Sequence, residues 1–410
     1  MTGWRTKELG ELCDFQRGLT YGKSDEVDVS NNVVLRANNV DLATHTLDLS
    51  DLRYISDSVS VPATKKVRRG SLLICTASGS KSHLGKVAYV DEDYGYAFGG
   101  FMGQLTPAAG VDGRYLFHAL TSPGYKEFIA ALSDGMNINN LKFDDLSRFP
   151  LPVPPLTEQR RIVAILDEAF KAIAIAKANA EKNLRNAQEL FELQRDACFA
   201  EENQSWPAEA LGDIAEVQSG GTPLVSTKEF WGGDIAWYSS GELNDVETVQ
   251  SERFITEAGL AGSNAKLFPK GSLLIGMYDT AALKMSILDR AAAFNQAIAG
   301  VRPNQNLEME FLFHAISVQK PALLSLRRGV RQKNLSLGKI KEIVVPVPSI
   351  EAQRCIIGRL NAAQELSDRL QAAYQGKLAA FDELKKSLLS QAFSGQLTDK
   401  AADEEIYEVA

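Results

Sequence analysis

Two long segments of the chain carry the same helical spacing of apolar residues. In the first segment, steps of four and three separate Ile162, Leu166, Ala169, Ile173, Ala176, Ala180, Leu184, Ala187 and Leu190. The same stripe returns 194 residues later, with Ser367 as one polar interruption, as Ile356, Leu360, Ala363, Ser367, Leu370, Tyr374, Leu378, Phe381 and Leu384. This heptad seam predicts two helices, each about 40 residues and roughly 60 Å long.

Each predicted helix begins after a group of prolines, at residues 152–155 and 346–348, as is typical of a helix start. A narrow apolar seam needs a partner surface. We expect the two helices to pair antiparallel, because each follows its own globular segment. That pairing relates the halves by a pseudo-twofold axis, with the globular segments at opposite ends. The alternative is that each helix packs on its own globular segment.

The whole chain is a two-copy repeat. Leu9 corresponds to Leu211 with an offset of 202, and Gly70 corresponds to Gly271 with an offset of 201. The offset falls to 196 at His118 and His314, and from Gly135 and Gly329 onward it stays at 194. Loops tolerate insertions better than packed elements do. Each copy is therefore expected to contain a globular part with variable loops, followed by a helix of constant length.

The globular parts are predicted to mix strands and helices. Short apolar runs at residues 71–75 and 86–90 are typical of strands, and residues 115–132 and 309–326 are typical of amphipathic helices. The predicted fold class is α/β mixed, with two globular domains separated by a long antiparallel two-helix coiled coil. The expected boundaries are 1–155 and 206–348 for the domains, 156–200 and 349–395 for the helices, and 396–410 for a tail.

Composition limits the classes of protein that fit. The 410 residues contain no apolar run long enough to span a membrane, and the polar N-terminus lacks a signal-peptide core, so we expect a cytoplasmic protein. The net charge of −8 opposes DNA binding unless basic residues are concentrated locally or a partner supplies them. Two local concentrations exist, namely Lys65, Lys66, Arg68 and Arg69, and Arg327, Arg328, Arg331 and Lys333.

No catalytic or metal-binding motif is found in the sequence. The four cysteines are scattered, which predicts reduced and mostly buried thiols, and neither a Gly-x-Ser-x-Gly nor a His-Glu-x-x-His motif is present. His118 and His314 lie at equivalent places on apolar helical faces and are interpreted as satisfied core residues. We therefore expect a protein that is not an enzyme, with no metal and no cofactor in this chain.

Several motifs resemble those of one known family. They are residues 152–163 with their echo at 346–357, Ser219-Gly220-Gly221-Thr222-Pro223, the run from Trp231 to Trp237, and residues 388–397. With them, nearly the whole chain resembles the specificity subunit of type I restriction–modification systems. The first domain departs from the pattern, since residues 17–36 lack the Trp-Gly-Gly-Asp-Ile run.

The resemblance implies two target recognition domains, each reading one half of an interrupted DNA sequence. It also implies that the helices act as a ruler and dock two modification subunits, which carry S-adenosylmethionine and methylate adenine. Restriction subunits, which use ATP and Mg²⁺, would join to cleave unmethylated double-stranded DNA. Because the two domains differ in sequence, the target should be asymmetric and bipartite.

Candidate DNA contacts are polar and basic loop residues at equivalent places in the two copies. In the first domain they are Tyr21, Lys23, Ser78, Ser80, Lys81, Ser82, Lys86, Asn137, Asn139 and Asn140. In the second they are Thr222, Tyr238, Ser239, Tyr278, Lys284, Arg331, Gln332, Lys333 and Asn334. Each could equally be a solvated loop residue, and Asn140 and Asn334 could instead cap the following helix. Partner docking is expected near the helix starts, at Gln159, Arg160, Gln353 and Arg354.

Three alternative functions stay open at this point. The repeat could belong to an adaptor that binds proteins alone, which specific duplex binding would exclude. It could be the specificity chain of a related system whose partner fuses nuclease and methyltransferase, which the size of the partner would reveal. A stand-alone nuclease or methyltransferase is the third, and activity of the purified chain would support it.

Overall fold

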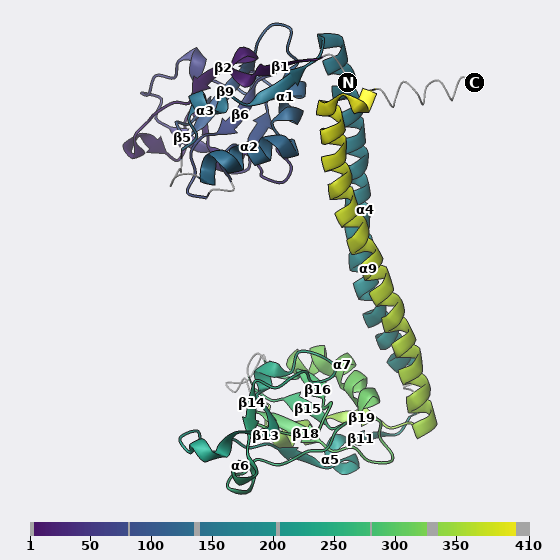
Figure 1. Cartoon of the computed structure of the whole chain (residues 1–410). Helices are drawn as coiled ribbons and strands as arrows, with labels where there is room; N and C mark the ends of the chain where they lie inside the picture. The colour runs from purple at the N-terminus through teal and green to yellow at the C-terminus, as the bar shows by residue number, and fades with distance from the viewer. Residues whose placement is uncertain are drawn as a thin grey trace, which may run out of the picture. The chain divides into compact units, whose positions relative to one another are not determined.

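The computed structural model describes residues 4–80, 83–134, 140–201, 206–278, 281–325 and 335–398. It divides into two units, Met1–Glu181 with Gly376–Ala410 (unit 1) and Lys182–Gln375 (unit 2). Two long helices, α4 (Leu156–Glu201) and α9 (Ile350–Ser394), each contribute one part to both units (Figure 1).

Unit 1 is built on two four-stranded sheets. One sheet is antiparallel, in the order β2 (Cys13–Arg17), β9 (Met102–Pro107), β6 (Leu72–Cys75) and β7 (Val87–Tyr89). The other has the order β3 (Glu26–Val27), β5 (Arg53–Ile55), β4 (Asn32–Leu35) and β8 (Ala97–Phe98), with β4 parallel to β8. A further antiparallel pair joins β1 (Arg5–Glu8) to β10 (Pro150–Val153). The expected strands at 71–75 and 86–90 are confirmed as β6 and β7.

Strand β6 is buried on both faces, which explains its continuous apolar run. Leu72 and Ile74 belong to the core cluster that includes helix residues, whereas Leu73 and Cys75 belong to a second cluster on the opposite face. Successive side chains of a strand point to opposite faces, so one strand serves both cores. Each fully buried leucine contributes about 1.5–3 kcal/mol.

One helix predicted in unit 1 is divided in two in the structure. Residues 115–132, expected as one helix, form α1 (Gly113–Ala119) and α2 (Pro123–Asp134), and α3 (Phe143–Leu146) follows. Pro123 starts the second helix because it has no N–H to donate to the preceding turn, and the hydroxyl of Ser122 accepts from the amide of Tyr125.

Unit 2 repeats the four-stranded antiparallel sheet and the separate strand pair, but its second sheet has three strands. Its four-stranded sheet has the order β12 (Val217–Ser219), β18 (Ile298–Val301), β15 (Leu273–Gly276) and β16 (Met285–Ile287). Its second sheet has the order β14 (Arg253–Ile255), β13 (Trp231–Tyr238) and β17 (Ala292–Phe294), and β11 (Ala208–Ala210) pairs with β19 (Val344–Pro346). The helices are α5 (Leu211–Ile214), α6 (Glu257–Ala261), α7 (Met309–Ser325) and α8 (Leu337–Lys341). The expected mixed α/β class is confirmed, and the sequence repeat is a repeat of the fold.

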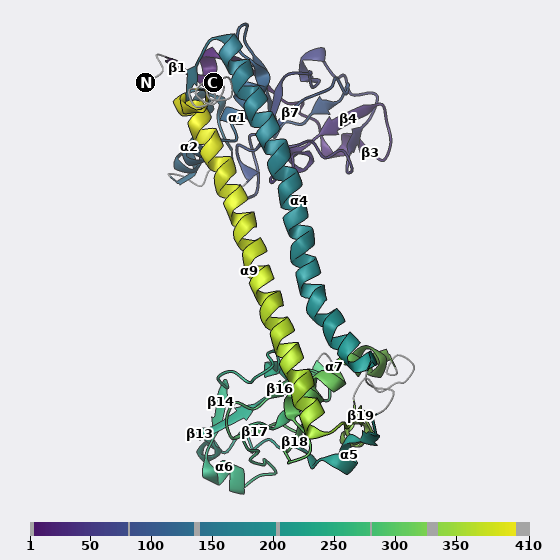
Figure 2. The same cartoon turned by 90° about the vertical axis from the view of Figure 1, so that its right-hand side faces the viewer.

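The two long helices pair inside each unit (Figure 2). In unit 1, Ile162 of α4 shares a core with Ala392 of α9, and Lys177 forms an ion pair of 2.7 Å with Asp382. Residue numbers rise along α4 while they fall along α9, so the pair is antiparallel. Both helices also pack on the globular part of each unit. Helix pairing and packing on the globular domain therefore occur together.

The predicted seam is wrong at one equivalent position in each helix. Leu190 and Leu384 are 42% and 45% exposed. The residues that follow them turn inward instead. Phe191 packs against the core of unit 2, and the Lys385 ammonium lies 5.1 Å from the centre of the Phe170 ring. The spacing placed both contacts one residue early, since Phe191 turns towards the core of unit 2 and Lys385 towards Phe170 of α4.

Candidate functional site

Three loops of unit 1 leave its antiparallel sheet at the same end. Residues 18–23 follow β2, residues 76–86 connect β6 to β7, and residues 99–101 precede β9. Strand β9 lies between β2 and β6 and runs antiparallel to both, so its start meets their ends. The sheet therefore gathers several of the predicted contact residues, which are far apart in the sequence.

A fourth segment of unit 1 joins this end of the sheet. The amide of Leu141 donates to the carbonyl of Thr76 at 2.6 Å, and Asn140 forms a β-bridge with Ala77. Asn140 is exposed, and Lys142 occupies the N-cap of α3, so Asn140 does not cap that helix. Lys23 and Ser80 are exposed, whereas Tyr21 and Ser78 are half-buried. Four predicted residues, Lys81, Ser82, Asn137 and Asn139, lie outside the described residues.

Unit 2 gathers the equivalent loops at the same end of its sheet. Residues 220–227 follow β12, residues 277–284 connect β15 to β16, and residues 295–297 precede β18. They carry the predicted residues Thr222, Tyr278 and Lys284. Ser239 follows β13 at the same end, because the amide of Asn295 donates to the carbonyl of Tyr238 at 2.9 Å. Four other predicted residues, Arg331, Gln332, Lys333 and Asn334, lie outside the described residues.

Two predicted contact residues are buried, and the prediction is corrected for both. The Lys86 ammonium donates to the carbonyl of Val40 at 2.7 Å, and desolvation lowers the pKa of this buried lysine. The Tyr238 hydroxyl donates to the carbonyl of Val249 at 2.6 Å, and the residue is 1% exposed. Neither side chain is on the surface, so in this structure neither can contact DNA.

This end of each sheet also carries residues that the sequence patterns did not single out. Phe101 is 72% exposed in the turn before β9. In unit 2, Asn264, Lys266 and Gln296 line a cleft of about 630 Å³ together with the loop that carries Thr222. The shared Ala-Phe pairs at 97–98 and 293–294, with an offset of 196, could have identified these turns in the sequence.

The helix starts are held by two buried glutamines, which corrects the docking prediction for both. Gln159 Oε1 accepts from the amide of Asp112 at 2.8 Å, while Nε2 donates to the carbonyls of Gly110 and Pro154. Gln353 repeats this arrangement with Glu308, Asn306 and Pro348. Both glutamines have 0% exposure, so their amides fasten each helix to a loop and are not available to a partner.

The adjacent arginines do lie on the surface. Arg160 lies 4.0 Å from Asp112, and Arg354 forms an ion pair of 2.7 Å with Glu308. Their side chains are 67% and 68% exposed. Arg160 and Arg354 therefore stay candidates for partner docking.

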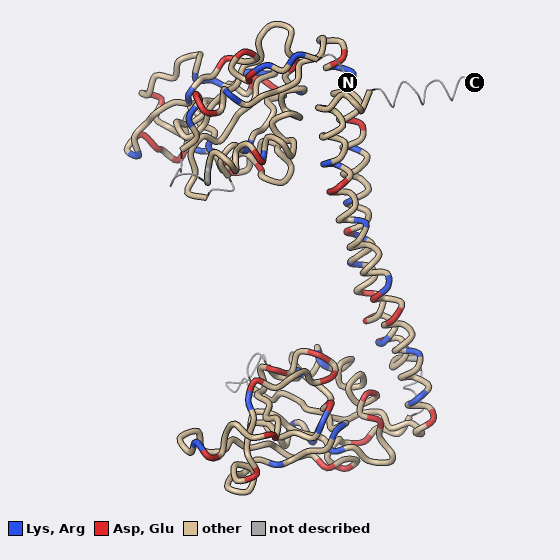
Figure 3. Tube along the Cα trace, in the orientation of Figure 1, with Lys and Arg blue, Asp and Glu red and all other residues tan. Residues whose placement is uncertain are grey.

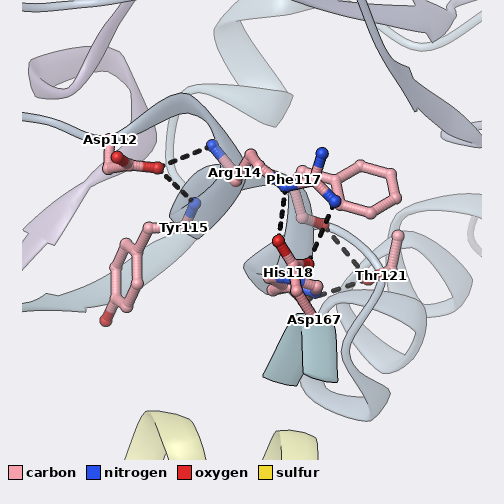
Figure 4. Close-up of polar contacts among 7 residues, drawn as sticks. All are labelled: Asp112, Arg114, Tyr115, Phe117, His118, Thr121 and Asp167. Atoms are coloured by element: carbon pink, nitrogen blue, oxygen red, sulfur yellow. Dashed lines mark hydrogen bonds and ion pairs between the residues drawn. The ribbon is translucent and has the colours of Figure 1, made fainter. Parts of the chain in front are cut away.

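A polar network attaches α1 to α4 in unit 1 (Figure 4). His118 Nε2 lies 2.9 Å and Arg114 Nε 2.8 Å from the carboxylate of Asp167. Burial alone would raise the pKa of Asp167, but hydrogen bonds from His118 and Arg114 outweigh burial and lower it. Asp112 accepts from two amides at the start of α1. Asp167 thus joins α4 to α1, while Asp112 caps the start of α1.

The two equivalent histidines are core residues, as expected, but they are not fully satisfied. Within the described part of the chain, the Nδ1 atoms of His118 and His314 have no hydrogen-bond partner. His314 packs edge-on against Phe191. Burial lowers the pKa of His314 to about 4, and Arg195 adds to this shift.

Charge is mixed over both units. Figure 3 shows Lys and Arg interspersed with Asp and Glu. The basic run at 65–69 is divided: the Lys65 ammonium donates to the carbonyl of Arg17 beside the gathered loops, whereas Arg69 precedes β6 at the opposite end of the sheet. The second run, at 327–333, lies outside the described residues. In the described part of each unit, positive and negative residues thus alternate along the chain and are not separated into different regions.

The described residues offer little to other kinds of site. Among the described residues, no cluster of His, Cys, Asp or Glu could hold a metal ion, and no helix is long and apolar enough to cross a membrane. Cys13, Cys75 and Cys198 are buried, Cys355 is exposed, and burial raises the pKa of Cys13 to about 12. The gathered loops are therefore the best candidate for a functional surface.

Comparison with known proteins gives a consistent result. The family model for the type I restriction modification DNA specificity domain matches residues 1–185 and 203–373. The type I restriction enzyme StySPI specificity subunit of Salmonella potsdam is 24% identical, over 97% of this chain and 89% of that protein. The EcoR124I/EcoR124II specificity subunit of Escherichia coli is 29% identical over 54% of this chain and 57% of its own length.

Two solved structures share the fold. A chain from a study of complex assembly and conformational transition in a type I R-M system has a TM-score of 0.75 and 19% identity, covering 97% of this chain and 99% of its own. The HsdS subunit from Thermoanaerobacter tengcongensis has a TM-score of 0.68 and 19% identity, covering 97% and 98%.

Proposed function

The chain belongs to the type I restriction–modification DNA specificity family, and from this premise we propose that it is the sequence-reading, non-catalytic subunit of such a complex. Each unit would read one half of an asymmetric, bipartite DNA target through the loops gathered at one end of its sheet. The chain would select the DNA site, and partner subunits would carry out the chemistry.

The observation that carries this proposal is the repeated loop cluster with different side chains. The two sheets have the same strand order and leave equivalent loops at the same end. The loop side chains differ at equivalent positions, since Tyr21 and Phe101 in one unit correspond to Pro223 and Ala297 in the other. Base discrimination depends on the side chains that reach the base edges, so one scaffold with two sets of side chains should read two different half-sites.

We further propose that two modification subunits bind the helices. Leu190 and Leu384 are exposed at equivalent positions, as are Arg160 and Arg354. Two equivalent surfaces in one chain can bind two copies of the same partner. S-adenosylmethionine would be held by those partners, and ATP and Mg²⁺ by restriction subunits.

The net charge of −8 supports a need for partners. Phosphate neutralisation supplies most of the non-specific affinity for DNA, and the described loops carry few lysines and arginines. We expect the isolated chain to bind duplex DNA weakly and the complex with basic modification subunits to bind it tightly.

The experiment that tests the proposal is a genome-wide map of methylated adenines in host cells with and without this gene. Loss of methylation at one asymmetric, interrupted motif would support the specificity role and give both half-sites. An unchanged map, together with an absence of any methyltransferase among co-purified partners, would support an adaptor protein instead. A co-purified partner that contains both nuclease and methyltransferase would indicate the related fused system.

A further inference from the structure

Equivalent turns precede β9 in unit 1 and β18 in unit 2, and the same main-chain hydrogen bonds hold them. In unit 1, the amide-to-carbonyl pairs are Gly99 to Leu35 at 2.9 Å, Leu19 to Phe98 at 2.7 Å and Thr76 to Phe101 at 2.9 Å. In unit 2, they are Asn295 to Tyr238, Gly221 to Phe294 and Met277 to Ala297, each at 2.9 Å. Three segments thus hold each turn. They are the loop after β2 or β12, the loop after β6 or β15, and the end of a strand in the second sheet.

The close fit of these turns is also repeated. A Cβ added at Gly18 would collide with the carbonyl of Gly99, and one added at Gly220 would collide with the carbonyl of Phe294. Both glycines let the first loop cross directly against the turn. Equivalent hydrogen bonds and close contacts therefore hold the backbone of the turn in both units.

The side chains at the tips of the two turns differ completely. Phe101 is 72% exposed although its carbonyl accepts bonds from the Thr76 amide, the Thr76 hydroxyl and the Ala77 amide. In unit 2, Ala297 takes the place of Phe101, and the preceding residue, Gln296, is exposed. Gln296 Oε1 accepts from the Thr222 hydroxyl at 2.5 Å. A fixed frame that carries an exposed aromatic ring in one copy and a positioned amide in the other is suited to reading different bases.

Building on the proposed function, we propose that these two turns enter a DNA groove and determine the sequence of their half-sites. Gln296 reads an adenine in the half-site of unit 2. Phe101 makes an apolar contact with a thymine methyl group in the half-site of unit 1. The turns, at residues 99–101 and 295–297, are the specificity determinants that the flanking loops position.

The chemistry of each side chain fits its assigned base. A glutamine amide pairs with adenine by accepting from N6 and donating to N7 in the major groove. The amide oxygen has two lone pairs, so the bond from Thr222 orients it and leaves one lone pair for the base. Lys266 and Asn264 line the same cleft of about 630 Å³ and can contact the sugar–phosphate backbone.

Phe101 offers neither a donor nor an acceptor, so it would read shape and apolar surface. The thymine C5-methyl is the apolar group exposed in the major groove. A single exposed apolar residue is common on protein surfaces. Phe101 is distinguished by its place, between the loops after β2 and β6 and on a backbone fixed by three hydrogen bonds to its carbonyl.

The test is a methylation map of cells that carry the complete system without its cleavage subunit, so that altered specificity does not lead to cutting of the host DNA. The chain would be replaced by Phe101→Ala or Gln296→Ala. Each variant should raise methylation at non-cognate bases about tenfold or more, at one position of one half-site. Phe101→Ala should affect one half-site and Gln296→Ala the other.

Matched controls lie away from the turns. Gln305→Ala removes the amide of an exposed glutamine beyond the opposite end of β18. Val29→Ala shortens the side chain of Val29, which is 82% exposed and precedes β4. Both should leave the motif unchanged. A motif that is also unchanged at every position in Phe101→Ala and Gln296→Ala would overturn the inference while leaving the proposed function intact. A wild-type map without any bipartite motif would defeat the proposed function itself.

Loss of all methylation in an alanine variant is resolved by a second measurement. The purified complex would be tested for its Tm and for binding to a duplex that carries the mapped motif. An unchanged Tm with at least tenfold weaker binding supports the inference. If the Tm falls, Phe101→Gln and Gln296→Glu replace the alanine variants, because they keep a long side chain at each turn and change its chemistry, and an unchanged motif in both would overturn the inference.

Discussion

The hydroxyl of Ser367 donates a hydrogen bond of 2.6 Å to the main-chain carbonyl oxygen of Ala187 on the facing helix in unit 2. Ser367 is 1% exposed, and its counterpart in unit 1 is Ile173, which is 8% exposed. The polar residue in the apolar seam therefore has a partner, and it does not carry the cost of an unsatisfied buried hydroxyl. A small side chain at this position also lets the two helices approach closely.

Substitutions at Ser367 should separate the effect of the hydrogen bond from that of the close approach. Ser367→Ala should lower the free energy of unfolding by about 1 kcal/mol or less, because the Ala187 carbonyl keeps its helical bond. Ser367→Leu should cost about 1–3 kcal/mol more, because the larger side chain overpacks the seam. Urea unfolding of the full chain measures both, and equal values for the two variants would contradict the close approach.

The buried glutamines at the helix starts should matter more than the arginines beside them. Gln159→Leu leaves the Asp112 amide and two carbonyls without their partner, which should cost about 1–3 kcal/mol or more. Gln353→Leu should do the same in unit 2. Arg160→Ala, a control at an exposed site, should change the free energy of unfolding by less than about 0.5 kcal/mol. The Asp112 amide in Gln159→Leu and the Glu308 amide in Gln353→Leu should exchange hydrogen faster, because each has lost its bond to the glutamine. Exchange as slow as in wild type would contradict this role of the glutamines.

The buried ring of His314 should make stability depend on pH. Its pKa is lowered to about 4 in the folded chain, whereas an unfolded histidine has a pKa near 6.5. The unfolded state therefore binds the proton more readily, so the contribution of the neutral ring is complete above pH 6.5. It is lost as the pH falls towards 4, by up to about 3 kcal/mol.

The His314→Phe variant isolates this effect, because carboxylates that titrate in both proteins cancel in the difference. The free energy of unfolding of wild type minus that of the variant, measured with urea, should be constant from pH 7 to 8. It should shrink steadily between pH 6.5 and 4. A difference that does not depend on pH would show that His314 binds its proton equally in both states.

Lengthening both helices should lengthen the unread spacer of the target. Seven residues inserted after Glu181 and after Gln375 keep the heptad in phase and add about 10.5 Å. At 3.4 Å per base pair, the spacer in the methylation map should grow by about three base pairs. The same insertion in one helix alone should disrupt pairing and abolish methylation. Unchanged spacing in the double insertion would contradict a ruler role.

The sequence alone predicted the features that depend on local patterns. Offsets and periodicity predicted the repeat, the mixed α/β class, the strands at residues 71–75 and 86–90 and the two long helices, the first of them at residues 156–200. The loops that carry Lys23, Ser80, Thr222 and Lys284 were also identified, because polar and glycine-rich segments after strands are visible without a structure.

Tertiary structure decided which side chains of those segments are available. Lys86 and Tyr238 have polar groups like their neighbours, but each finds a carbonyl inside the protein and is buried. Gln159 and Gln353 are polar residues at the start of a helix, where exposure is expected. Loops 40 or more residues away in the sequence bind and bury them. Conversely, Phe101 is apolar in the sequence and exposed in the fold. Local patterns determine the elements, because helix and strand spacing are properties of neighbouring residues. Burial and the proximity of distant loops depend on which strands pair across long separations in the sequence. Local patterns of neighbouring residues do not reveal that pairing.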